Sequence, residues 1–155
     1  MAAAPDLETV HATAIALAGR GVLIRGPSGS GKSDLALRCL ALPVSHLSPD
    51  QFQLIADDRV VLRRATGGIE LTCPPAIAGQ LEVRGIGIVD VPSASAARLA
   101  LVADLVPQTR AIERMPEPAA VDILGHRVLG IKLHAFEASA PLKLLLAMTS
   151  LGIGP

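Results

Sequence analysis

The chain has 155 residues, half of them hydrophobic, and its 14 basic and 14 acidic side chains give a net charge of zero. This length predicts a single domain, and the balanced charge gives no electrostatic basis for binding nucleic acid or an acidic membrane. The only aromatic side chains are Phe52 and Phe136. We therefore expect an aliphatic core, no stacking platform for bases, and aliphatic groups and backbone around any bound adenine.

Cys39 and Cys73 form no C-x-x-C pair, and we interpret them as buried, reduced thiols rather than a disulfide or metal site. The N-terminal segment lacks the basic start of a signal peptide, and no apolar run is long enough to span a bilayer. We expect a cytoplasmic protein with no membrane partner, forming one domain over 1–155 after a mobile start at 1–7.

The first predicted elements surround a glycine-rich loop. A strand over 10–18 turns at 19–21 into a second apolar strand, which ends at Gly26. A helix begins at Lys32 and ends near Leu42, because Pro43 cannot continue it.

The remainder reads mainly as strands and turns. The predicted elements are a loop at 44–51, strands at 52–58 and 59–63, a hairpin turn at 66–68 into 69–72, a loop or edge segment at 73–79, an alternating segment at 80–91, a buried strand at 98–106, a loop at 109–120, a hairpin over 121–133 around Gly125, and a final helix capped by Ser139. This order lacks the βα alternation of a doubly wound sheet. It predicts an α/β fold, in which a P-loop sits in a mixed β-sheet with hairpins and few helices.

The central motif is an octapeptide that fits G-x-x-x-x-G-K-[ST] without a mismatch, between a predicted strand and a predicted helix. Its residues are Gly26, Pro27, Ser28, Gly29, Ser30, Gly31, Lys32 and Ser33. Glycines let successive N–H groups converge on phosphate oxygens, and the helix adds its positive dipole end. Lys32 is expected to reach the β- and γ-phosphates, and the Ser33 hydroxyl to bind Mg²⁺. A plain Gly/Ser turn is the alternative.

Further polar residues are candidates for the same site. Asp57 and Asp58 end a predicted strand and fit a carboxylate near Mg²⁺ and a base for the acceptor hydroxyl. An acidic turn is the alternative. Glu82 fits a second metal-side carboxylate, and Arg114 fits a cation for a transferring phosphoryl group. Taken alone, Glu82 and Arg114 are better interpreted as surface residues, and His11 as a structural residue.

Together these segments resemble the catalytic domain of the HPr kinase/phosphorylase family. The resemblance rests on GVLIRGPSGSGKSDLAL, then LIADDRVVL, then LEVRGIGIVDV, with His11 preceding the loop, and it covers about residues 8–95 well. It implies a fold similar to the nucleotide-binding domain of phosphoenolpyruvate carboxykinase.

The resemblance also implies an activity and its residues. The family uses ATP and Mg²⁺ to phosphorylate a serine of HPr, the phosphocarrier of the sugar phosphotransferase system, and reverses this with inorganic phosphate, releasing pyrophosphate. Carried over by position, Lys32 binds phosphates, Ser33 and Glu82 serve Mg²⁺, and Asp58 is the base forwards and the acid in reverse. His11 and Arg114 fall at active-site positions of the family.

The chain departs from the family pattern in several places. It starts near the catalytic portion, it has Asp34 where Glu is usual, it reads ERMPEP around Arg114, and it differs at 135–141 in a segment associated with dephosphorylation. The family is hexameric, which suggests a homo-oligomer, although the sequence leaves the oligomeric state open. A small-molecule P-loop kinase and a non-catalytic ATP-binding sensor remain the alternatives.

Overall fold

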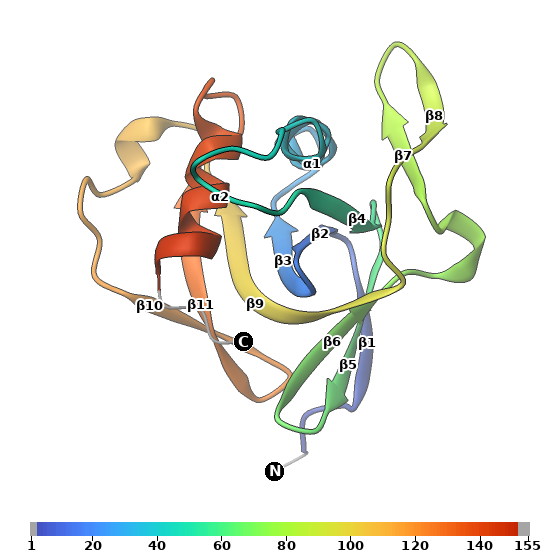
Figure 1. Cartoon of the computed structure of the whole chain (residues 1–155). Helices are drawn as coiled ribbons and strands as arrows, with labels where there is room; N and C mark the ends of the chain where they lie inside the picture. The colour runs from blue at the N-terminus through green and yellow to red at the C-terminus, as the bar shows by residue number, and fades with distance from the viewer. Residues whose placement is uncertain (1–2, 152–155) are drawn as a thin grey trace.

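In the computed structural model, which describes residues 3–151, a large curled β-sheet carries both α-helices on one side (Figure 1). The strands are β1 (Leu7–Val10), β2 (Thr13–Leu17), β3 (Arg20–Arg25), β4 (Phe52–Ala56), β5 (Val60–Ala65), β6 (Gly68–Thr72), β7 (Gln80–Val83), β8 (Gly87–Asp90), β9 (Ala96–Leu105), β10 (Ala119–Ile123) and β11 (His126–Leu133). The helices are α1 (Lys32–Leu40) and α2 (Ala140–Ser150), with 3₁₀ turns at Pro75–Ile77 and Thr109–Ala111. The predicted α/β class, with a mixed sheet, hairpins and few helices, is confirmed.

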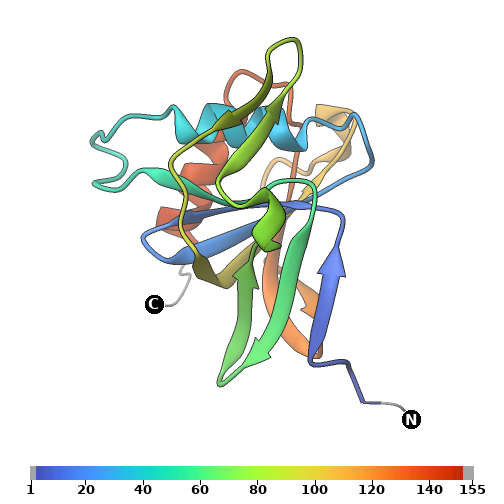
Figure 2. The same ribbon diagram turned by 90° about the vertical axis from the view of Figure 1, so that its right-hand side faces the viewer.

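The sheet is organised around β9. The strand order is β1-β5-β6-β9-β3-β2-β4, and β11 also pairs with β9 and carries β10 at its outer edge. Along one edge β9 pairs in parallel with β3, whereas the other edge is shared by β6 at residues 96–98 and β11 at residues 101–105. Because two strands occupy successive parts of one edge, the sheet curls (Figure 1). The β7–β8 hairpin forms a separate two-stranded sheet beside α1 (Figure 2).

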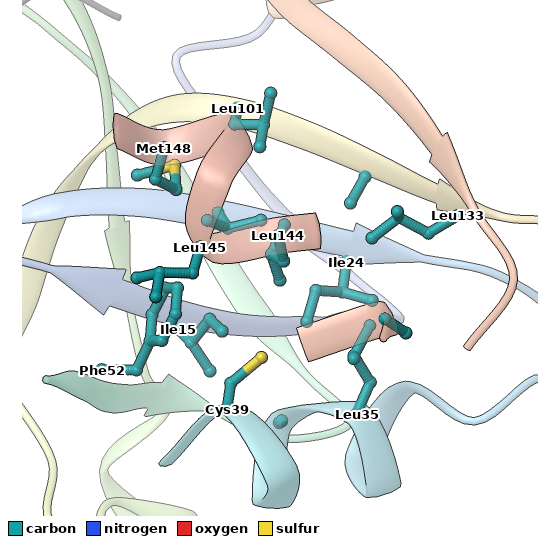
Figure 3. Packing of buried hydrophobic residues seen from close by; sticks show 14 of the residues in the cluster. Ile15, Ile24, Leu35, Cys39, Phe52, Leu101, Leu133, Leu144, Leu145 and Met148 are labelled. Atoms are coloured by element: carbon teal, nitrogen blue, oxygen red, sulfur yellow. The ribbon is translucent and has the colours of Figure 1, made fainter. Parts of the chain in front are cut away.

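The central strands are buried on both faces. Ile15 and Ile24 point toward the two helices, where they pack with Leu35, Leu144 and other aliphatic side chains (Figure 3). Leu23, the next residue along β3 from Ile24, packs in the second cluster on the opposite face of the sheet. A strand buried on both sides has no polar face, which explains the continuous apolar run before the glycine-rich loop.

Several predicted boundaries need correction. The strand expected over 10–18 is two strands, because the chain breaks at 11–12 and β1 then pairs with β5. Leu7 already belongs to β1, and residues 1–2 of the start expected to be mobile lie outside the described residues. Ser139 occupies the N-cap position of α2, but its side chain makes no capping hydrogen bond.

Candidate active site

The P-loop joins the end of β3 to the start of α1 and folds around its own lysine. Lys32 is 7% exposed, and its Nζ donates to the carbonyl oxygens of Gly26 at 2.7 Å and Pro27 at 3.1 Å. Gly29 and Gly31 have φ angles of 81° and 98°, which side-chain-bearing residues rarely adopt. Within the described residues Lys32 forms no ion pair, so its charge is available to an anion held by the loop.

Asp57 is the buried centre of the polar network beneath the loop. It follows β4, is 5% exposed, and its Oδ1 accepts hydrogen bonds from Ser33 Oγ at 2.6 Å and Thr13 Oγ1 at 3.0 Å. Its Oδ2 accepts from the backbone N–H of Glu82 at 3.2 Å. One carboxylate thus joins β2, β4, β7 and the start of α1, which holds the predicted metal-side residues together.

Asp58 has the opposite environment. Its carboxylate is 59% exposed, its backbone is left-handed with φ 69°, and its Oδ1 lies 3.0 Å from Nδ1 of His11, which is 53% exposed. The backbone N–H of Ala12 donates to the Asp58 carbonyl at 3.3 Å, so the break between β1 and β2 is tied to the turn after β4. This contact places His11 beside Asp58.

These elements border one cleft of about 770 Å³. Its lining comprises His11, Thr13, Asp58 and Glu82, P-loop residues including Lys32 and Ser33, the β7–β8 turn at 83–87, and Asp34, Leu37 and Phe136. Asp57 does not itself line the cleft but contacts it through Ser33 and Thr13. A preformed concave site with a few convergent polar groups is the usual form of a small-molecule site.

Arg114 is the predicted catalytic residue that the structure does not bring to the lining of the cleft. It lies exposed on the loop between β9 and β10 and is not among the residues that line the cleft. The other predicted catalytic and metal-side residues meet at or directly beneath the cleft.

Two site residues were missed from the sequence. Thr13 is completely buried within an otherwise apolar strand, and a lone hydroxyl in such a run is the signal that could have indicated it. Phe136 is 61% exposed and lines the cleft, so the cleft contains an aromatic side chain, whereas aliphatic surroundings for a bound base stay a prediction. No local pattern revealed Phe136, because its position depends on how the β11–α2 turn meets the P-loop.

The site offers oxygen donors rather than a preformed metal cage. Among residues 3–151, no group of three or more His, Cys, Asp or Glu side chains is arranged to hold a metal ion. Ser33 Oγ and Asp57 Oδ1 nevertheless converge beside the cleft, and Glu82 lines it. Mg²⁺ prefers oxygen ligands and commonly uses one or two carboxylates together with substrate phosphates, so this donor set fits it.

Fold and site together define a P-loop domain built on a mixed sheet. Residues 3–131 match the family described as HPr serine kinase C-terminal domain, and the chain belongs to that family. The helices of the described region include none that is long and apolar enough to cross a membrane.

Curated relatives and a solved structure agree with this assignment. The chain is 38% identical over 136 residues to the HPr kinase/phosphorylase of Bordetella petrii and 37% identical over 138 residues to that of Acidovorax sp. strain JS42. Both alignments cover 81% of this chain but only 42% and 41% of those relatives. The Hpr(Ser) kinase/phosphatase of Coxiella burnetii superimposes with a TM-score of 0.75 at 25% identity, covering 91% of this chain and 88% of that one.

Proposed function

We propose that the chain catalyses ATP- and Mg²⁺-dependent phosphorylation of a serine in an HPr-type phosphocarrier, and the phosphate-dependent reversal that yields pyrophosphate. The relatives that carry this activity by name are more than twice as long as the aligned segment, so the support for this activity in the chain comes from its site. An ATP-dependent reaction on a phosphocarrier would take place in the cytoplasm.

The phosphate-binding part of the proposal rests on the P-loop. The loop holds Lys32 at its centre, and the N-terminal dipole of α1 adds positive potential where phosphates would lie. Ser33, Asp57 and Glu82 would hold Mg²⁺, which when bound neutralises charge on the transferring phosphoryl group. Ser30 Oγ is buried without a partner in the described residues and is a candidate donor to a ligand in the loop.

The observation that carries the proposal is the difference between two adjacent carboxylates. Asp57 accepts three hydrogen bonds and is buried, which suits a structural or metal-side role. Asp58 is exposed at the same cleft, with His11 as its neighbour, which suits an exchange of protons with a substrate. A domain that only bound nucleotide would need no second carboxylate there.

In the forward reaction, the serine oxygen of the carrier attacks the γ-phosphorus while its proton passes to the Asp58 carboxylate. The bond from the γ-phosphorus to the bridging oxygen breaks, and ADP leaves with that electron pair. His11 orients the carboxylate, and Lys32 stabilises charge on the phosphates. Arg114 takes part in no step, because it is not among the residues that line the cleft.

In the reverse reaction, an oxygen of inorganic phosphate attacks the phosphorus of phosphoserine. Its proton passes to Asp58 as the serine O–P bond breaks, and Asp58 returns a proton to the departing serine oxygen. The products are pyrophosphate and the free serine hydroxyl. One carboxylate serves both reactions because the proton transfer at the serine oxygen is retraced, although the phosphoryl donor is ATP in one reaction and the phosphoryl acceptor is inorganic phosphate in the other.

The test incubates the chain with HPr, Mg²⁺ and γ-labelled ATP, followed by excess inorganic phosphate. We expect label on an HPr serine, its release as pyrophosphate, and loss of both steps in Asp58→Asn with ATP binding retained. Label that phosphate cannot remove would contradict the reverse activity. ATP binding with no transfer to HPr would contradict the proposal and favour a sensor, and transfer to a small acceptor alone would favour a metabolite kinase.

A further inference from the structure

An aromatic side chain lies exposed beside the P-loop. Of the two phenylalanines, Phe52 is 2% exposed in the core, whereas Phe136 is 61% exposed and lines the cleft. Its ring reaches the loop itself, since a Cβ built on Gly31 would lie 3.0 Å from Phe136 Cζ. The exposed part of this ring gives the cleft an apolar surface that a ligand bound there would cover.

The backbone that carries this ring is fixed from both sides. Arg38 of α1 donates from Nη2 to the carbonyl of Ala135 and from Nη1 to that of Glu137 at 3.2 Å. The Nε atom of Arg38 also lies 2.9 Å from the Asp34 carboxylate, which orients the guanidinium. On the other side, Lys143 of α2 pairs with the Glu137 carboxylate at 2.9 Å. The turn that bears Phe136 is therefore tied to the helix that follows the P-loop.

The position of Phe136 relative to the phosphate-binding loop suggests which ligand would cover its ring. Gly31 is the N-cap of α1 and precedes Lys32, so phosphates bound by the loop would lie close to Phe136. Leu37, further along α1, also lines the cleft and adds an apolar surface there. A nucleotide anchored by its phosphates carries a flat base on the far side of its ribose, and such a base binds more tightly where it can stack on an exposed aromatic ring.

We propose that Phe136 is the platform on which the base of the bound nucleotide stacks, with Arg38 as the residue that positions it. This inference deepens the proposed function, since it rests on nucleotide binding in the same cleft. Stacking uses only the face of a base, so the platform accepts adenine and guanine alike.

Comparison of two Mg²⁺-bound ligands tests the platform, because ATP carries a base and inorganic tripolyphosphate does not. We expect Phe136→Ala to weaken ATP binding about fivefold or more, while tripolyphosphate binding stays within twofold of the wild type. Phe136→Leu, which keeps apolar bulk without an aromatic face, should also weaken ATP selectively. Met115→Ala removes another exposed apolar side chain, which is 91% exposed and is not among the residues that line the cleft, and should change neither affinity.

A second variant gives a direct signal. The chain contains no tryptophan, so Phe136→Trp introduces a single fluorophore at the proposed platform. ATP should change its emission, and tripolyphosphate should leave the emission unchanged. Equal weakening of both ligands by Phe136→Ala, unchanged ATP affinity in that variant, or equal emission changes with both ligands would overturn the inference.

These measurements use no HPr. A base-dependent affinity in a chain that transfers nothing to HPr would contradict the proposed function and leave the stacking platform standing. Transfer to HPr together with an ATP affinity that does not depend on the base would support the proposed function and contradict the stacking platform.

Discussion

His11 Nδ1 lies 3.0 Å from Asp58 Oδ1, and the two residues belong to separate turns joined by the Ala12–Asp58 backbone hydrogen bond. The pair lines the cleft that the P-loop also borders. A carboxylate that acts as a general base from an exposed turn keeps a defined orientation only if a neighbouring side chain holds it. The contact with His11 therefore gives this histidine a positioning role in the proposed reaction.

Replacing His11 should slow transfer without weakening nucleotide binding. In His11→Ala, we expect transfer to HPr to fall by up to about 100-fold, because a misaligned base is costly. The ATP affinity should stay within twofold, since His11 does not belong to the P-loop. His11→Asn, which keeps a hydrogen-bond donor, should recover part of the rate. A rate loss matched by an equal loss of ATP affinity would contradict the positioning role.

Removing the Thr13 hydroxyl should destabilise the fold. Thr13→Val keeps the shape of the side chain but leaves the buried Asp57 carboxylate with one hydrogen bond fewer. We expect the free energy of unfolding to fall by about 1–3 kcal/mol, measured by urea denaturation. Thr13→Ser retains the hydroxyl and serves as the control. Equal stability of the valine variant and the wild type would show that the bond contributes little.

Alanine substitutions at two P-loop glycines distinguish the effect of backbone strain from the effect of a steric contact. Both Gly29 and Gly31 have positive φ, but a Cβ on Gly29 meets nothing within 4 Å, whereas one on Gly31 would lie 2.8 Å from Ala135 Cβ. Alanine at either position should cost about 1 kcal/mol or more of backbone strain. Gly31→Ala should lose further stability and more ATP affinity, because it also pushes against the β11–α2 turn. Thermal denaturation and ATP titration of both variants measure the difference, and equal losses would contradict the contact.

The two cysteines should react with thiol reagents at very different rates. Burial raises the pKa of Cys39 to about 12, and burial together with the negative charge of Asp57 raises the pKa of Cys73. A raised pKa lowers the thiolate fraction at pH 8, and only the thiolate reacts. Native protein should therefore label slowly at Cys73, faster as the pH rises, and at Cys39 only after denaturation. Rapid labelling of both thiols at pH 8 would contradict this prediction.

The sequence alone predicted the P-loop, the fold class, and about half of the residues that line the cleft. It did so because the phosphate cradle is local in sequence: glycines, lysine and serine must be adjacent for the backbone to curl and the helix to begin. Periodicity and turn chemistry likewise predicted the apolar strand that leads into Gly26, and the acidic pair Asp57 and Asp58 that follows the strand at 52–56. The resemblance supplied the roles of Glu82 and His11, which local patterns left open.

Only the tertiary structure decided which of these residues meet. Curling of the sheet around β9 brings the β11–α2 turn onto the P-loop, so Phe136 lies at the cleft although it is 105 positions after Gly31 (136 minus 31). The tertiary structure also gives the two adjacent carboxylates different environments. Asp57 is buried and accepts three hydrogen bonds, whereas Asp58 is exposed beside His11. Burial and long-range contacts are set by strand order and curvature, which no short stretch of residues encodes.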